Sequence, residues 1–409
     1  MYRLLSFLGI FVFVGLCYVL STHRSRVRWK TVLVGLLAQF ALGLLVLYWK
    51  PGNAALQDLG KGVARFLALS DEGGGFIFGV LAKPGEVGRV FGSEQAFLFA
   101  FQVLPTIIFF SAFMAVLYHL GVMQLVVKGL AWLMVRLMRT SGSESLSVAG
   151  NIFVGQTEAP LLVRPFLDKM TQSELMTVMT GGFATIAGGV FALYVGFGID
   201  PGHLIVASVM SAPAAIVVAK LLVPETEESE TMGTVSMAME KSSGNVVEAT
   251  ANGAIDGLKL AMNVAAMLIA FLGLVAVINW LLGMLSEDLS LQIILGWIFS
   301  PLAFCLGVEW GDVPRVGELL GTKIAVTELI AYKSLAGMTQ DGVLSERSVT
   351  ISTYALCGFA NLGSIGIQIG GISALAPGRR SDLARLGVRA MMGGAFASWM
   401  TAAVAGILV

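Results

Sequence analysis

Residues 145–163 read SLSVAGNIFVGQTEAPLLV, an apolar stretch whose only charged residue is Glu158. An ionisable side chain at the centre of a bilayer costs roughly 2.5–3.5 kcal/mol on insertion scales, so it usually faces a cavity or a partner. Gly155 and Pro160 divide the stretch into halves of about ten residues, too short to span a membrane as a helix. The pattern predicts a re-entrant helical hairpin with residues 156–158 at its tip, because broken backbone within a membrane must line a cavity or be buried in protein. A loop helix that stays outside the membrane is the alternative.

The composition of the whole chain predicts a membrane protein. Charged residues make up 13% of the 409 residues, against about 25% in a typical soluble domain, and apolar residues make up 56%. This hydrophobicity excludes a disordered chain. The formal net charge is zero, so the sequence predicts no nucleic-acid partner. The three cysteines and three histidines are scattered, which excludes a disulfide framework and a zinc site.

Several intervals without Asp, Glu, Lys or Arg approach or exceed the roughly 20 residues that cross a bilayer as a helix. They are residues 4–22, 31–49, 95–127, 175–199, 201–219, 260–286, 289–308, 348–378 and 390–409. Basic residues, which favour cytoplasmic loops, follow the first and third intervals and precede the last. They are Arg24, Arg26, Arg28 and Lys30, then Lys128, Arg136 and Arg139, then Arg379, Arg380, Arg385 and Arg389.

All three basic clusters lie on the cytoplasmic side only if one of these intervals does not cross the membrane. We assign this role to residues 289–308, which contain Pro301, as an interfacial or re-entrant segment. The sequence thus predicts an all-α polytopic membrane protein with eight transmembrane helices and both termini outside the cytoplasm. Nine crossing helices that break the charge rule are the alternative.

Two further segments are not predicted to cross. Residues 53–70 mix charges with Leu, Val and Phe at helical spacing, which predicts a helix lying in the membrane interface. Residues 224–250 are acidic and Ser-rich, which predicts a cytoplasmic loop. The chain then divides into an N-terminal scaffold (1–140), a first hairpin with its following helices (141–223), a central region (224–317), and a second hairpin with the last two helices (318–409).

The second hairpin is predicted in residues 319–335, LLGTKIAVTELIAYKSL, where Glu328 again interrupts a short apolar stretch. Gly182-Phe-Ala-Thr185 follows the first hairpin and Gly358-Phe-Ala-Asn361 follows the second. Since the first hairpin starts from the inside and the second from the outside, the halves form an inverted repeat, a plan typical of secondary transporters. The four glycines within residues 180–190 fit either an unwound turn or close helix packing.

The predicted site combines carboxylates, amides and hydroxyls with no arginine. Besides Glu158 and Glu328, it holds Gln156, Asn361, Thr157, Thr185 and Ser364. Nothing in this set neutralises an anion, so a neutral polyhydroxylated or heterocyclic solute fits better, with Phe153, Phe183 and Phe359 available to flank a flat ring. Asn151, Thr185 and unwound backbone carbonyls near Val154 and Ile186 offer oxygen ligands that suit a hard cation such as Na⁺.

Three segments together resemble the bacterial concentrative nucleoside transporters. They are Gly155-Gln-Thr-Glu-Ala-Pro160, Glu328-Leu-Ile-Ala-Tyr332 and Cys357-Gly-Phe-Ala-Asn361-Leu-Gly-Ser364-Ile365. The resemblance implies Na⁺-coupled import of nucleosides such as uridine by alternating access, with eight transmembrane helices, two opposed hairpins and a homotrimeric assembly. It also implies a place in the bacterial inner membrane, with the termini in the periplasm.

By the family pattern, the first hairpin contacts the nucleobase and the second holds the ribose. The implied nucleobase residues are Gln156, Thr157, Glu158 and Val190; the implied ribose residues are Glu328, Asn361 and Ser364, with Phe359 beside the substrate. The implied Na⁺ ligands are the side chains of Asn151 and Thr185 and the carbonyls of Val154 and Ile186.

The sequence departs from the family pattern at Thr327, where Asn is usual, at Gly363, where Ser is common, and at Gln368, which replaces an apolar residue. The first two positions bear on ribose contacts or base preference. Asn151 and Thr185 keep the oxygen pattern of Na⁺-coupled members, so Na⁺ coupling is preferred to its alternative, H⁺ coupling. A membrane-embedded hydrolase with two acidic catalytic groups is a candidate of another class, and a passive channel is a third.

Overall fold

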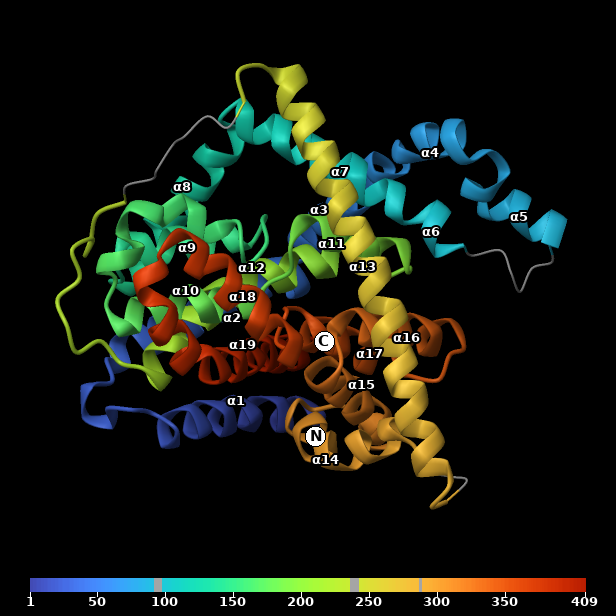
Figure 1. The fold of residues 1–409 in the computed structure, drawn as a ribbon. Coiled ribbons are helices and arrows are strands. Elements are labelled where there is room, and N and C mark those ends of the chain that lie inside the picture. Colours follow the sequence, from blue (N-terminus) through green and yellow to red (C-terminus); the bar gives the residue numbers. More distant parts are fainter. Residues whose placement is uncertain (92–97, 236–242, 287–288) are drawn as a thin grey trace.

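The computed structural model describes residues 1–91, 98–235, 243–286 and 289–409 (Figure 1). Helices make up 81% of the structure, and the described residues form no strand, which confirms the all-α prediction. The start of the predicted span 95–127 and part of the predicted loop 224–250 lie outside the described residues.

Within the described ranges, seven helical segments are long and apolar enough to cross a membrane. They are α1 (Tyr2–Val19), α2 with its π-helical end η2 (Trp29–Tyr48), Ala100–His119 in α6 (Phe99–Gln102) and α7 (Leu104–His119), Gln172–Gly196 in α10 (Gln172–Ala184) and α11 (Gly188–Gly196), α12 (Pro201–Leu222), α13 (Val246–Gly283) and Pro377–Leu408, which includes α19 (Arg380–Leu408). The predicted span 348–378 is instead divided into α17 (Glu346–Leu356) and α18 (Leu362–Leu375). Eight crossings therefore stay a prediction.

The shorter segments of the first half refine two predictions. They are η1 (Arg24–Arg26), α3 (Lys50–Ala68), α4 (Ser70–Phe78), η3 (Gly79–Ala82), α5 (Pro84–Phe91) and α8 (Val122–Met138). Helix α3 confirms the helix predicted at 53–70, and its place in the interface stays a prediction. The charge-free interval 95–127 is not one helix, because α7 (Leu104–His119) ends before Gly121, whose positive φ of 81° turns the chain into α8.

Helix α14 (Leu291–Cys305) occupies the segment to which we assigned no crossing. Its 15 residues rise about 22 Å, less than the roughly 30 Å of a hydrocarbon core. Its end returns to the chain start, since the Leu306 carbonyl accepts a hydrogen bond from Ser6 Oγ at 2.7 Å. A helix this short fits the predicted segment that does not cross, and the number of crossings stays a prediction.

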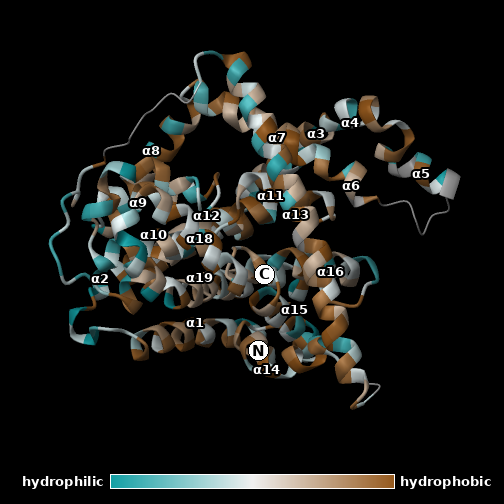
Figure 2. Cartoon of the chain, in the orientation of Figure 1, coloured by the Kyte–Doolittle hydropathy of each residue, from teal (hydrophilic) through white to brown (hydrophobic). Residues whose placement is uncertain are grey.

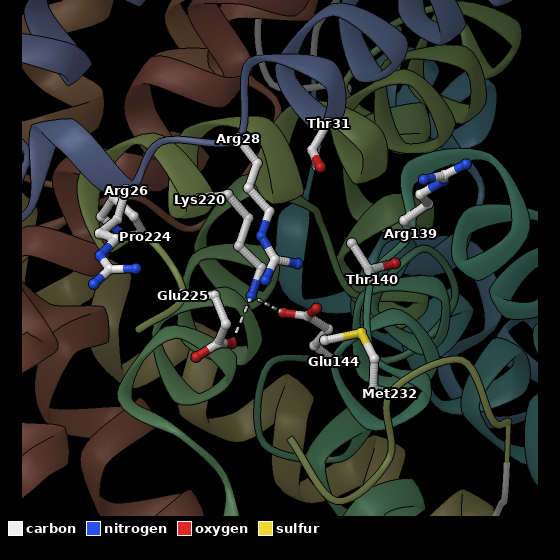
Figure 3. Close-up of a pocket in the computed structure, with 10 residues that line it drawn as sticks. All are labelled: Arg26, Arg28, Thr31, Arg139, Thr140, Glu144, Lys220, Pro224, Glu225 and Met232. Atoms are coloured by element: carbon white, nitrogen blue, oxygen red, sulfur yellow. Dashed lines mark hydrogen bonds and ion pairs between the residues drawn. The ribbon is translucent and has the colours of Figure 1, made fainter. Parts of the chain in front are cut away.

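Side chains from each of the three basic clusters lie at one end of the molecule, which we call the basic end. Arg28 and Arg139 line one pocket there (Figure 3). Arg379 joins this end by donating a hydrogen bond to the Met170 carbonyl at 2.6 Å. The two termini meet at the opposite, terminal end, where Arg3 Nε donates to the Val409 carbonyl at 3.0 Å.

The inner helices differ from the outer ones in burial. In the most apolar stretches, 89% of the residues are buried in α12 and 83% in the segment with α19. In the segments with α7 and α13, only 11% and 12% of the residues are buried. Helices α7 and α13 pack along each other, and α7 also packs against α11. Helix α13 carries hydrophobic residues along much of its length (Figures 1 and 2). The apolar surface of α7 and α13 is therefore left for lipid or a partner subunit.

Candidate functional site

The first predicted hairpin has two arms of the expected length. Helix α9 (Gly142–Asn151) starts at a capping box between Ser141 and Glu144, and all ten of its residues are buried. Residues 152–158 form a non-helical tip. The second arm, η5 (Ala159–Lys169), is a 3₁₀ helix that contains Pro165, which lacks the N–H that a regular helix requires. Entry of this hairpin into the membrane stays a prediction.

A buried ion cluster fixes the base of this hairpin at the basic end. Lys220 Nζ lies 2.7 Å from Glu144 Oε2 and 3.3 Å from Glu225 Oε2 (Figure 3). Lys220 also donates to Ser173 Oγ at 2.9 Å, so the cluster joins α9, α10, α12 and the loop after α12. The pocket around it contains none of the predicted substrate residues, and we assign its ion pairs a structural role.

Replacing Lys220 by methionine is expected to destabilise the protein by about 3 kcal/mol, because two buried carboxylates then lose their cation. The control is Lys169→Met. Lys169 pairs with Glu230 at 3.2 Å, but both side chains are more than half exposed, so the expected loss is below about 1 kcal/mol. Thermal unfolding of the purified protein measures both. Equal unfolding temperatures for the two variants would show that the cluster does not hold the hairpin.

The helix after this hairpin is unwound where the glycines cluster. Helix α10 (Gln172–Ala184) stops at Thr185, whose backbone is extended, and α11 (Gly188–Gly196) starts three residues later. The tip of the hairpin is bonded to this break, since Gly188 N donates to the Phe153 carbonyl at 3.2 Å. The glycines also allow close packing between α10 and the hairpin tip, because a Cβ on Gly182 would lie 2.8 Å from the Cβ of Gln156. Both alternatives left open by the sequence are therefore present.

The four predicted Na⁺ ligands lie at the end of α9, on the tip and on this break. Asn151 is buried; its Nδ2 donates to the Ser147 carbonyl at 3.1 Å, and its Oδ1 has no hydrogen-bond partner among the described residues. Thr185 Oγ1 donates to the Gly181 carbonyl at 2.9 Å, which leaves its lone pairs available. Val154 and Ile186 stand in non-helical backbone. This set of oxygens fits a hard cation.

The second hairpin places Glu328 at the start of its second arm. Helix α15 (Val313–Ala325) leads to the tip, and α16 (Glu328–Gln340) leads back. Thr327 caps α16 by accepting a hydrogen bond from Ile330 N at 3.3 Å, so threonine at this position still supplies the oxygen that an N-cap needs. The base of the hairpin closes at the terminal end, where Ser345 Oγ donates to Asp312 Oδ2 at 2.9 Å. The two hairpins thus open from opposite ends.

Glu328 is buried, and both of its carboxylate oxygens accept hydrogen bonds. Tyr194 OH donates to Oε1 at 3.2 Å, and Asn361 Nδ2 donates to Oε2 at 2.7 Å. Asn361 does not lie within a helix. It precedes α18 as the N-cap and accepts from Ser364 N at 2.9 Å. The chain breaks here because Gly358, with a φ of 113°, allows the backbone to lie against Phe183.

Glu158 has a different environment from Glu328. It is exposed, and its Oε1 accepts from Thr157 Oγ1 at 2.9 Å. Its other oxygen lies over Gly155, next to Ala187 at the start of α11. Among the described residues no hydrogen bond joins the two hairpin tips, so a pocket shared by both carboxylates stays a prediction.

The remaining predicted substrate residues lie around these tips. Val190 is buried on α11 and Phe359 is half-buried in the second break. Gln156 and Gln368 both lie against Gly182, and Gln368 Nε2 donates to the Met179 carbonyl at 3.0 Å. Gln368 therefore ties α18 to α10.

No role was predicted for Tyr194 or Lys323 from the sequence. Tyr194 is fully buried and donates a hydrogen bond to Glu328. Lys323 is fully buried and donates to the Ala355 carbonyl next to the second break. The only available signal was a lysine in the short apolar stretch before Glu328, and it concerned Lys323 alone.

Comparison with known proteins gives matches along the chain. Residues 8–81 match the Na⁺ dependent nucleoside transporter N-terminus, residues 100–201 match a nucleoside recognition (gate) domain, and residues 203–406 match the Na⁺ dependent nucleoside transporter C-terminus. Sodium/nucleoside cotransporter 1 of Mus musculus is 46% identical over 99% of this chain. Solute carrier family 28 member 3 of Eptatretus stoutii is 44% identical over 99%. The chain spans 64% and 60% of the lengths of these relatives.

Solved structures match over nearly their whole length. CNTnw in an inward-facing substrate-bound state is 44% identical, with a TM-score of 0.96, and the alignment covers 100% of this chain and 98% of that one. A substituted CNTnw in an outward-facing state is 43% identical, with a TM-score of 0.94 and the same coverage. With three adjoining family models and a full-length structural relative in agreement, the chain belongs to the family of Na⁺-dependent, or concentrative, nucleoside transporters.

Proposed function

We propose that this chain imports nucleosides by alternating access, driven by a Na⁺ gradient. The proposal rests mainly on the position of Glu328. This buried carboxylate accepts hydrogen bonds from Tyr194 and Asn361 where a hairpin meets two broken helices. Buried acids at broken helices are typical of substrate sites in secondary transporters. Membership of a family whose relatives are named sodium/nucleoside cotransporters supports both the substrate class and the ion.

Helix α11 connects the proposed nucleobase and ribose contacts. Glu158 lies beside Ala187 at its start, and Tyr194, which binds Glu328, lies seven residues further, a rise of about 10 Å. Val190 lies between them and shares a face with Tyr194. A nucleoside along this face would place its base toward Gln156, Thr157 and Glu158, and its ribose hydroxyls toward Glu328, Asn361 and Ser364, with Phe359 at its side.

The coupling ion is assigned to the oxygens of the first hairpin tip and the first break. Asn151 Oδ1 is buried and has no hydrogen-bond partner in the part of the chain that the structure describes, and a cation would satisfy it. Thr185 Oγ1 and the carbonyls of Val154 and Ile186 complete the proposed set. Oxygen ligands from unwound backbone suit Na⁺.

Replacing Thr185 by valine is expected to raise the Na⁺ concentration for half-maximal uptake by about tenfold or more, because one ligand oxygen is lost. The matched control is Thr177→Val on the same helix. Thr177 Oγ1 makes the same kind of bond, to the Ser173 carbonyl four residues earlier, at 2.8 Å. The control should leave the Na⁺ dependence unchanged. Equal Na⁺ curves for both variants would remove Thr185 from the ion site.

Uptake of labelled uridine by proteoliposomes, with Na⁺ and H⁺ gradients varied separately, tests the function. Accumulation that needs the Na⁺ gradient is expected, with the nucleoside recovered unchanged. Accumulation driven equally well by a pH gradient in choline buffer would favour H⁺ coupling. Hydrolysed product would favour the membrane-embedded hydrolase, and equilibration without accumulation would favour a channel.

The setting of the transporter follows from the same proposal. We place the chain in a bacterial inner membrane, with the basic end in the cytoplasm and both termini in the periplasm. The exposed apolar surface of α7 and α13 supports a homo-oligomer, for which a trimer is proposed.

A further inference from the structure

The two repeats differ in how they supply positive charge to their hairpins. Residues 140–163, which include the first hairpin tip, contain no Lys or Arg, and neither do residues 172–196 with the first break. The second hairpin instead carries Lys323, which is 0% exposed, in the last turn of α15. A fully buried lysine in the apolar interior of a membrane protein is costly unless its ammonium is satisfied.

The ammonium of Lys323 is satisfied by the broken helix of its own repeat. Its Nζ donates to the Ala355 carbonyl at 2.9 Å and to the Cys357 carbonyl at 3.2 Å. These carbonyls belong to the end of α17, where helical carbonyls lack partners and the helix dipole is negative. Unwound carbonyls and the ends of half-helices are where secondary transporters coordinate Na⁺.

Lys323 corresponds in position to the proposed ion site of the first repeat. Asn151 ends the first arm of one hairpin, seven residues before Glu158, and Thr185 lies in the break that follows. Lys323 lies near the end of the first arm of the other hairpin, five residues before Glu328, and contacts the break that follows. In both repeats, the first arm and the break meet at a place that favours a cation.

We infer that Lys323 is a covalently attached cation that occupies the second repeat's counterpart of the Na⁺ site. This inference rests on the proposed function and deepens it. Each repeat then has one tip carboxylate and one cation, which is an exchangeable Na⁺ in the first repeat and a fixed ammonium in the second. It follows that one Na⁺ accompanies each nucleoside, because the second place is already filled.

The test replaces Lys323 by threonine, which removes the ammonium and leaves space and an oxygen for an ion. Purified protein is compared for the Na⁺ dependence of its unfolding temperature and, in proteoliposomes, for the ratio of labelled Na⁺ to labelled uridine taken up. The wild type should give a ratio of about one, and Lys323→Thr should approach about two, with a steeper dependence of unfolding temperature on Na⁺.

Two controls separate charge from hydrogen bonding. Ser398→Ala removes the other donor to the Cys357 carbonyl without changing any charge, so its flux ratio should stay at that of the wild type. Lys323→Arg keeps the charge and should also keep the ratio. A purely structural role for Lys323 would lower stability without altering either Na⁺ readout.

Three results would overturn the inference. One is a Lys323→Thr protein that transports with an unchanged ratio, and another is an inactive variant whose unfolding temperature gains no Na⁺ dependence. The third needs no variant and applies even if Lys323→Thr does not fold, namely a wild-type ratio of about two. Wild-type uptake that ignores Na⁺ would instead contradict the proposed function itself, so the two failures are distinguishable.

Discussion

Replacing Glu328 by glutamine is expected to lower nucleoside uptake by about two orders of magnitude. The carboxylate accepts charge-assisted hydrogen bonds from Tyr194 OH and Asn361 Nδ2, and its place at the first position of α16 favours a negative charge. Glutamine removes the charge and turns one acceptor into a donor. Two charge-assisted bonds at roughly 1.5 kcal/mol each correspond to about 100-fold in affinity.

The measurement is initial uridine uptake in proteoliposomes, normalised to the amount of folded protein. Glu318→Gln is the matched control, because Glu318 lies on the other arm of the same hairpin and is only half-buried. Uptake by this control should stay close to that of the wild type. Tyr194→Phe, which removes one of the two donors, should fall between them. Wild-type uptake by Glu328→Gln would exclude the carboxylate from the substrate site.

The sequence predicted those parts of the site whose signals are local. A lone acid between Gly155 and Pro160 was enough to predict the first hairpin, because an apolar stretch divided in this way cannot span a membrane. Basic clusters were enough to predict that residues 289–308 do not cross, and the 15-residue α14 fits that prediction.

Features that depend on contacts between distant segments were not predictable from one sequence. Tyr194 and Glu328 are 134 residues apart, and nothing in an apolar stretch distinguishes a tyrosine that binds an acid from one that packs. The break after α17 was missed because glycine in membrane helices is as common in close packing as in turns. Its signal was the likeness of Gly358-Phe-Ala-Asn361 to Gly182-Phe-Ala-Thr185, whose own unwinding remained open.

The differing exposure of the two tip acids fits a carrier that loads in steps. Both carboxylate oxygens of Glu328 already accept hydrogen bonds from side chains. The Glu158 carboxylate has only its neighbour Thr157 as a hydrogen-bonding partner among the described residues. Under the proposed function, the acid with spare acceptor capacity would be available to an incoming base, while the buried one has its position fixed before the ribose arrives. The proposal therefore assigns the two acids different roles.

Replacing Gly358 by alanine is expected to prevent folding of a stable carrier. Its φ of 113° is strained for any residue with a Cβ, and that atom would lie 2.5 Å from the Phe183 carbonyl oxygen and 2.7 Å from the Ala184 carbonyl carbon. Both obstacles are backbone at the end of α10, so no side-chain rotation relieves them. Strain and overpacking together are expected to cost about 3 kcal/mol or more.

The yield of monodisperse protein and its thermal unfolding measure this effect, with Gly366→Ala as the matched control. Gly366 lies on α18 next to the same break, and a Cβ there would meet nothing within 4 Å. Alanine at a free helical position is favoured over glycine by about 1 kcal/mol, so the control should be as stable as the wild type or more so. If Gly358→Ala were equally stable, the two broken helices would not need to touch at this point. The close crossing that brings Asn361 to Glu328 would then have another cause.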